Sequence, residues 1–402
     1  MATRESALDA ATPSGSGRPQ CDRKVVLQVG PAPGTSGGIA AVIEETMKFD
    51  SPFFEQRLCP SWLPNGKFSS FPTATRAAIK MCRSVGRWNI AHVHLSEYGS
   101  FIREGSLLLL AKLLRKPAVV TLHGADLTRH VAKYPVLTRY VLNSADLVLC
   151  LGKNHAYVVQ AIAGTPTQII ANPLGPESFP SDSDTPPRVT TSPTFLFAGE
   201  VGARKGHDRL IEAWPTVQCR FPDARLRIAG PVADGYSQSA RSRVDYLGNL
   251  SRTRLQEEIA AATAIVLPSR AEVLPMALIE SHAQGTPTVY TKVGEWQVFQ
   301  DAPGIRLVDV DAKSEEEIVA SLADAMIDCA SDHHDYSSEL TAWTRRTFST
   351  DVVAAQLDKA YHRVLSKRAD QAGRLTKSQT NKAAKLPVTD PQNWIAEATE
   401  NQ

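Results

Sequence analysis

The stretch that decides the fold is residues 264–280, which read AIVLPSRAEVLPMALIE. The apolar run at 264–267, closed by a Pro-Ser pair, predicts a buried strand that ends in a loop. Glu272 lies in that loop, and Glu280, eight positions later, lies in a helical run that stops near a Gly-Thr-Pro sequence. A loop at the carboxyl end of a strand is where open α/β sheets bind their ligands.

Two glutamates at this spacing are by themselves weak evidence for a functional site, because most glutamates are simply solvated. The rest of the chain supplies the context. Strands are predicted at residues 24–29, 90–94, 118–122, 146–150, 194–198, 224–229 and 245–248, and helices at 39–47, 101–115 and 206–217. Strands that alternate with helices predict parallel sheets with helices on both faces. We therefore expect an α/β protein with two Rossmann-like, doubly wound domains that face a central cleft.

The 402 residues divide into six predicted segments. Length alone suggests two domains plus tails. A stretch rich in Pro, Ser, Asp and Thr separates the two series of strands, and both chain ends are polar. We expect a disordered segment at 1–23, a first domain at 24–175, a linker at 176–193, a second domain at 194–345, a helix at 346–367 and a flexible tail at 368–402.

Composition narrows the class of protein. The chain is 43% hydrophobic and 21% charged, which is ordinary for a globular protein, and its net charge of +2 predicts no general attraction to nucleic acid. Six scattered cysteines without a C-x-x-C pair argue against a zinc site or a disulfide framework. No apolar stretch has the length of about 18 residues that a transmembrane helix needs. These features predict a cytoplasmic protein.

A second candidate element is the loop at residues 199–206, which follows a predicted strand and opens a helix. Backbone N–H groups at the start of a helix, together with Arg204 and Lys205, suit a diphosphate. A solvated basic turn explains the same residues equally well when they are taken alone.

Taken in order, these motifs resemble the retaining GT-B glycosyltransferases of family four, the glycosyl transferases group 1. The resemblance covers most of residues 194–295. Its segments are FAG at 197–199, KG at 205–206, LRIAG at 226–230, YLG at 246–248, the E-x7-E pair and GTPTV at 285–289. The amino-terminal half is similar more loosely, through GGI at 37–39 and TLHGAD at 121–126.

The resemblance implies roles for residues of the second domain. Glu280 would hold the ribose of a nucleotide, and Glu272 would face the transferred sugar as a catalytic residue. Lys205 would bind the diphosphate and stabilise the leaving group, because fixed cations act on charge that develops in the transition state. Donor binding would also involve Arg204 and the backbone around Leu274, Met276 and Ala277.

The first domain contributes a glycine loop and a histidine. Gly37 and Gly38 carry no side chain before a helix, which allows a phosphate or sugar to approach the backbone. His123 follows a predicted strand; a hydrogen-bonded core histidine is the plain interpretation, and the resemblance makes it a partner of the donor sugar. Asp126 is either its orienting partner or a helix cap. His92 and His94 share one strand face and are interpreted as structural or acceptor-side residues.

The chain departs from the family pattern at two positions. Glu200 stands where the family usually has Arg, and a carboxylate there would repel phosphate unless it points away. Glu295 stands where the family has a second Gly after Thr-x-x-Gly, which puts the adjoining contacts in doubt.

A basic stripe is predicted at Arg76, Lys80, Arg83 and Arg87, which are spaced four, three and four apart. Most such runs are solvated helix faces; the alternative is contact with anionic lipid headgroups. The segment SFIR at 100–103, after a His-x-His, resembles bacterial exopolysaccharide and capsule glycosyltransferases. Together these features suggest a peripheral position on the inner face of a membrane.

The resemblance therefore implies an enzyme that moves a sugar from a nucleoside diphosphate sugar to an acceptor hydroxyl, on a sugar or lipid-linked sugar, with retention of configuration. It implies no bound cofactor and no metal. Two alternatives stay open: a nucleotide-sugar epimerase on the same fold, and a sugar-nucleotide-binding homologue without activity.

Overall fold

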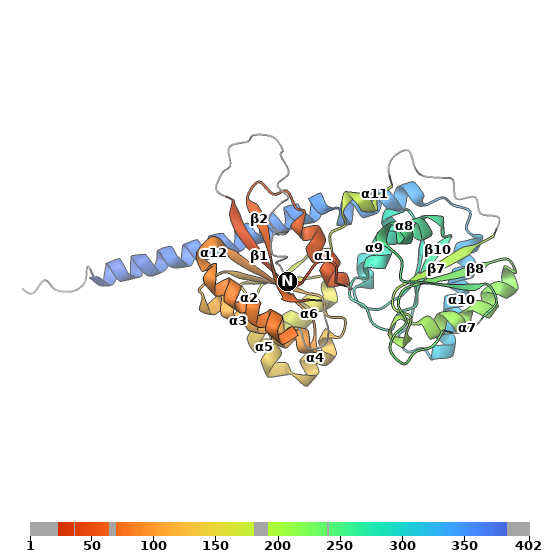
Figure 1. Ribbon diagram of the computed structural model, residues 1–402, viewed down its shortest axis with the longest axis horizontal. Coiled ribbons are helices and arrows are strands. Elements are labelled where there is room, and N and C mark those ends of the chain that lie inside the picture. Colours follow the sequence, from red (N-terminus) through yellow and green to blue (C-terminus); the bar gives the residue numbers. More distant parts are fainter. Residues whose placement is uncertain (1–22, 36, 64–69, 181–191, 239–240, 384–402) are drawn as a thin grey trace, which may run out of the picture.

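The computed structural model describes residues 23–35, 37–63, 70–180, 192–238 and 241–383. Within these ranges it forms two α/β domains side by side, each built on a six-stranded parallel sheet (Figure 1). Nearly all of the segment predicted to be disordered, most of the predicted linker and the end of the predicted tail lie outside the described residues.

The first sheet has the order β2-β1-β3-β4-β5-β6. Its inner strands are apolar and buried on both faces, as parallel strands between helices must be. The strands are β1 (Lys24–Pro31), β2 (Phe54–Trp62), β3 (Ile90–Leu95), β4 (Ala118–Leu122), β5 (Leu147–Cys150) and β6 (Thr167–Ile169). The covering helices are α1 (Gly38–Met47), α2 (Ser70–Arg83), α3 (Tyr98–Leu113), α4 (Leu127–Lys133), α5 (Pro135–Asn143) and α6 (Lys153–Ile162).

The second sheet has the order β12-β11-β10-β7-β8-β9. Its strands are β7 (Thr194–Ala198), β8 (Arg225–Ala229), β9 (Val244–Gly248), β10 (Ala264–Leu267), β11 (Thr288–Thr291) and β12 (Ile305–Val308). Its helices are α7 (His207–Arg220), α8 (Arg252–Ala261), α9 (Met276–Ala283), α10 (Glu315–Ser331) and α11 (Ser337–Phe348). Strand order reverses direction between the neighbours β7 and β10, and such a switch point is where ligands bind. The prediction of two doubly wound α/β sheets is confirmed.

The last helix, α12 (Thr350–Ala383), crosses back from the second domain and runs along the first (Figure 1). Its buried side chains Val353, Leu357 and Tyr361 repeat at helical spacing and share a core with Val26 and Ile90 of the first sheet. The carboxyl end of the chain therefore stabilises the amino-terminal domain.

The prediction that this helix ends at residue 367 and gives way to a flexible tail is wrong, because α12 continues to Ala383. Residues 368–383 are polar, and polarity was interpreted as disorder. They also contain many Ala, Arg, Lys and Gln residues, one Gly and no Pro, so nothing in them stops a helix. The first proline after the helix is Pro387.

Several polar contacts join the domains, among them those of two buried carboxylates, Glu45 and Glu295. Arg252, at the start of α8, lies 3.0 Å from a carboxylate oxygen of the buried Glu45 on α1. Glu295 is only 1% exposed and accepts hydrogen bonds from the backbone amides of Asn154 (3.0 Å) and His155 (2.7 Å). These amides belong to the first turn of α6, so a carboxylate from one domain caps a helix of the other.

We expect Glu295→Ala to destabilise the protein by about 2 kcal/mol, because it removes two charge-assisted bonds and leaves the buried amide of His155 unpaired. Thermal or denaturant unfolding measures the effect, and Glu316→Ala on exposed surface is the control. A midpoint equal to that of the control would show that the cap contributes nothing.

Candidate active site

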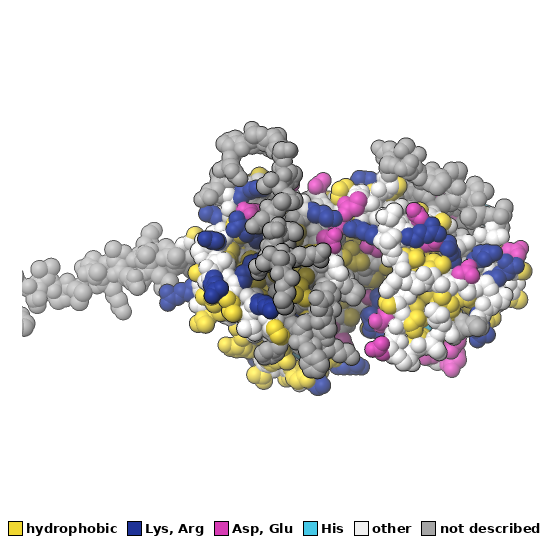
Figure 2. Space-filling view, viewed as in Figure 1, with side chains coloured by type: hydrophobic (Ala, Val, Ile, Leu, Met, Phe, Trp, Pro, Cys, Tyr) yellow, Lys and Arg dark blue, Asp and Glu magenta, His cyan; other side chains and the backbone are white. Residues whose placement is uncertain are grey.

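A cavity of about 1060 Å³ lies between the domains. The space-filling view shows the groove that separates the two lobes (Figure 2). Loops at the carboxyl ends of β1, β3 and β4 line one side, and loops after β7 and β10 with the start of α9 line the other. The carboxyl-terminal edges of both parallel sheets therefore border this cavity, and that edge is where parallel sheets bind ligands.

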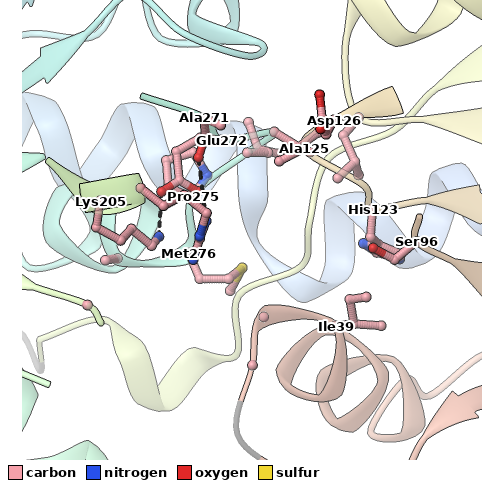
Figure 3. Close-up of a pocket in the computed structure, with 18 of the residues that line it drawn as sticks. Ile39, Ser96, His123, Ala125, Asp126, Lys205, Ala271, Glu272, Pro275 and Met276 are labelled. Carbon is pink, nitrogen blue, oxygen red and sulfur yellow. Dashed lines mark hydrogen bonds and ion pairs between the residues drawn. The ribbon is translucent and has the colours of Figure 1, made fainter. Parts of the chain in front are cut away.

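Lys205 and Glu272 meet at the switch point of the second sheet (Figure 3). The Lys205 ammonium donates a hydrogen bond to Oε1 of Glu272, and the Ser269 hydroxyl donates to the same oxygen at 3.0 Å. Both side chains are largely buried, at 17% and 9% exposed. The pair brings a cation and a carboxylate from two separate loops to one wall of the cavity.

The start of α9 adds backbone donors to this wall. Met276 and Ala277 are its first two residues and line the cavity, and the amides of a first helical turn have no intrahelical acceptor. Across the cleft, a Cβ on Gly38 would lie 3.7 Å from Met276 Cγ, so the glycine loop approaches this helix closely. Gly37 has φ +129°, a conformation that favours glycine. Predicted residues of both domains therefore meet here.

Glu280 lies one turn further along α9, on the face that Met276 and Ala277 share, and is not among the residues that line the cavity. Burial raises the pKa of its carboxyl to about 7; nearby Arg252 opposes this rise and Glu45 adds to it. The carboxylate is therefore half ionised near neutral pH, unlike an ordinary glutamate.

This pKa predicts a pH-dependent nucleotide affinity. Ribose hydroxyls donate to a carboxylate, so the ionised form of Glu280 is the binding form and affinity should rise as pH increases through 7. With a pKa of about 7, the ionised fraction rises roughly tenfold from pH 6 to pH 8. Calorimetry with UDP-glucose, whose phosphodiester groups do not titrate in this range, measures the slope. If UDP-glucose affinity depends on pH in Glu280→Gln as it does in the wild type, Glu280 is not the residue that binds the ribose.

His123 is held by a buried chain of polar groups. Its Nε2 lies 2.9 Å from Nδ1 of His94, and Nε2 of His94 lies 2.8 Å from Oε1 of Gln28. The Gln28 amide donates to the hydroxyl of Tyr361 on α12 at 3.2 Å. Because the Gln28 oxygen only accepts, His94 donates from Nε2 and accepts at Nδ1, and His123 donates from Nε2. Burial holds the pKa values of both histidines well below the usual range, so both are neutral.

The structure distinguishes the predicted histidines. His123 lines the cavity, whereas His92 and His94 are buried at 2% and 1% exposure and are not among the lining residues. The partner that orients His123 is His94. Asp126 is the N-cap residue of α4, but its side chain makes no capping hydrogen bond and instead accepts one from the Tyr98 hydroxyl at 3.2 Å.

Other positions add to this description. Arg204 lines the cavity, whereas Glu200 is exposed and is not among the lining residues. Sequence reasoning missed Glu97, Tyr98 and Arg129, which line the first-domain wall. Glu97 and Tyr98 had one available signal, a position shortly after a strand, as for His123, whereas Arg129 lies on α4 and had none.

The basic stripe lies away from the cavity. Arg76, Lys80 and Arg83 are exposed on α2, whereas Arg87 is on the 3₁₀ turn that follows, because the α-helix ends at Arg83. Figure 2 shows Lys and Arg side chains on this lobe. Among the residues that the structure describes, no helix combines the length and apolarity needed to cross a bilayer.

The arrangement of two doubly wound domains around a shared cleft is the GT-B fold, and solved structures bear this out. Anabaena Alr3699/HepE in complex with UDP superposes with a TM-score of 0.65 at 16% identity, over 84% of this chain and 99% of that one. Sucrose-phosphate synthase from Thermosynechococcus elongatus superposes with a TM-score of 0.63 at 18% identity, over 86% of this chain and 100% of that one. At these identities the likeness concerns the fold.

Residues 192–332 match the family model described as "Glycosyl transferases group 1", so the second domain is similar to that family. A D-inositol 3-phosphate glycosyltransferase of Streptomyces griseus is 32% identical over 115 residues, 25% of this chain and 24% of the relative. Glycogen synthase of Mycobacterium tuberculosis is 26% identical over 206 residues, which are 46% of this chain and 49% of the relative. The chain thus matches between a quarter and half of the length of these relatives.

Proposed function

We propose that this protein is a retaining glycosyltransferase that moves a sugar from a nucleoside diphosphate sugar to an acceptor hydroxyl. The observation that carries the proposal is the Lys205–Glu272 pair at the switch point of a group 1 domain, beside the free amides of α9. The match to that family and the UDP bound in a structural neighbour support a nucleotide donor.

In this proposal the donor diphosphate binds against Lys205, Arg204 and the amides of Met276 and Ala277, and the ribose binds Glu280. The bond between the anomeric carbon and the phosphate oxygen breaks, and its electron pair goes to the diphosphate. The acceptor hydroxyl oxygen bonds to the anomeric carbon on the same face, and its proton passes to the departing phosphate oxygen. Fixed donors act on this developing charge, and no metal or cofactor is required.

Glu272 and His123 serve the sugar in this scheme. Oε2 of Glu272 accepts no hydrogen bond from the described residues and is available for a sugar hydroxyl. His123 is neutral and uses its Nε2–H on His94, which leaves Nδ1 as an acceptor. Both residues thus act as hydrogen-bond acceptors that position the sugar.

We further propose that the reaction belongs to cell-surface polysaccharide or glycolipid synthesis on the inner face of a membrane. The exposed cations of α2 suit anionic headgroups. Sedimentation with vesicles of phosphatidylglycerol tests the membrane contact. Binding equal to that of phosphatidylcholine vesicles would leave the stripe as a solvated face.

The enzyme assignment is tested by a panel of nucleotide sugars, each supplied with membrane lipid extract, with free sugars or with no acceptor. Release of nucleoside diphosphate that increases with acceptor supports transfer. Donor conversion without acceptor indicates an epimerase. No release or conversion with any donor would overturn the proposal in favour of a binding protein.

A further inference from the structure

One wall of the cavity has no role in donor binding in the proposed function. This wall, here called the acceptor wall, consists of Glu97, Tyr98, Asp126 and Arg129, from the loops after β3 and β4 and the start of α4. Figure 3 places Asp126 on the side of His123, across the cavity from Lys205. The wall therefore faces the space where a second substrate meets the donor sugar.

Tyr98 is held in an uncommon backbone conformation. Its φ of +52° is in the left-handed region, which is costly for an aromatic residue and typical of functional sites. Its amide donates to Nδ1 of His130 at 3.3 Å, and its hydroxyl donates to Asp126 at 3.2 Å. The residue is nevertheless 41% exposed. The backbone amide and the hydroxyl of Tyr98 are thus both hydrogen-bonded, while much of its side chain stays exposed at the cavity.

The charges on the acceptor wall disfavour an anion. Glu97 accepts from the Ser96 hydroxyl at 2.7 Å and from the Asp126 amide, which fixes its carboxylate. The Arg129 guanidinium lies 3.4 Å from the Asp126 carboxylate, and its side chain is 77% exposed. Two carboxylates and one guanidinium leave the wall with one negative charge. Phosphate would be repelled there, whereas hydroxyl groups are good donors to carboxylates.

We propose that the acceptor is an uncharged glycosyl residue, bound with its ring against Tyr98 and its hydroxyls on Glu97 and Asp126. This inference rests on the proposed transferase function and names its second substrate class. It separates this chain from a relative named for D-inositol 3-phosphate, because the net charge of the acceptor wall is negative and its one cation, Arg129, lies beside the Asp126 carboxylate.

The test uses the donor that the wild-type enzyme accepts, with p-nitrophenyl hexopyranosides as neutral acceptors and inositol 1-phosphate and glucose 6-phosphate as anionic ones. Tyr98→Asn keeps a residue that tolerates positive φ but removes the ring. We expect its acceptor KM to rise about tenfold or more, with unchanged affinity for the donor's nucleotide and unchanged Tm. Tyr98→Phe should stay within about threefold. Tyr140→Ala, an exposed tyrosine outside the cavity, is the control.

Each outcome decides the inference. A wild-type enzyme that prefers the phosphate-bearing acceptors, uses no neutral sugar, or keeps its acceptor KM in Tyr98→Asn overturns the sugar subsite and leaves the transferase assignment intact. A wild-type enzyme that releases no nucleotide from any donor overturns the proposed function itself.

Discussion

Replacing Lys205 with methionine is expected to lower kcat about 100- to 1,000-fold, the usual loss when one group that stabilises transition-state charge is removed. Methionine keeps the length and packing of the side chain but removes the cation that faces the departing diphosphate. Nucleotide release measures kcat, and calorimetry with UDP measures binding. We expect UDP affinity to fall less than kcat, because the charge on the leaving group develops in the transition state.

Lys313→Met is the matched control for this variant. Lys313 is an exposed lysine of the same domain and lies outside the cavity. A Lys205→Met enzyme with the kcat of this control would exclude Lys205 from the chemistry, and the loop at 199–206 would then be a solvated basic turn.

Glu272→Ala is expected to lower kcat about 100-fold while nucleotide affinity stays the same or improves. In the structure Glu272 binds the ammonium of Lys205, so removing the carboxylate frees that cation for the diphosphate. An effect on kcat with intact binding is the signature of a residue that touches the transferred sugar. The comparison variant is Glu316→Ala on exposed surface.

A combined Lys205→Met, Glu272→Ala variant adds a check on this pair. Because the two side chains are bonded to each other, the two losses should not multiply. Fully multiplicative losses, or a Glu272→Ala variant that loses nucleotide affinity as strongly as turnover, would contradict the separate roles given to these residues.

Interior strands were more predictable than edge strands: among the interior strands only β11 was missed, and among the four edge strands only β9 was predicted. The strand predicted at 118–122 is β4 and that predicted at 194–198 is β7, because both are continuous apolar runs buried on both faces. β2 was missed because it lies at the edge of its sheet and its sequence, FEQRLCPSW, mixes charged residues and a proline with apolar ones. An edge strand is solvated along one side, so it tolerates this composition.

The same physical limit applies to the site. Lys205 and Glu272 were predicted because each lies in a loop with its own local pattern. The capping role of Glu295 was not predicted, although the sequence shows that this residue departs from the family pattern. Its partner Asn154 is 141 positions away, and only the folded chain brings that helix end to the carboxylate. Tyr98 was missed for a related reason, since its φ of +52° cannot be read from residue types.

The most direct test of the account is the anomeric configuration of the product, measured by proton NMR during a transfer reaction with the accepted donor. The account predicts a new glycoside with the same anomeric configuration as the donor sugar, formed in step with one nucleoside diphosphate per transfer. A glycoside of the opposite configuration, or donor consumption without any new glycoside, would contradict it.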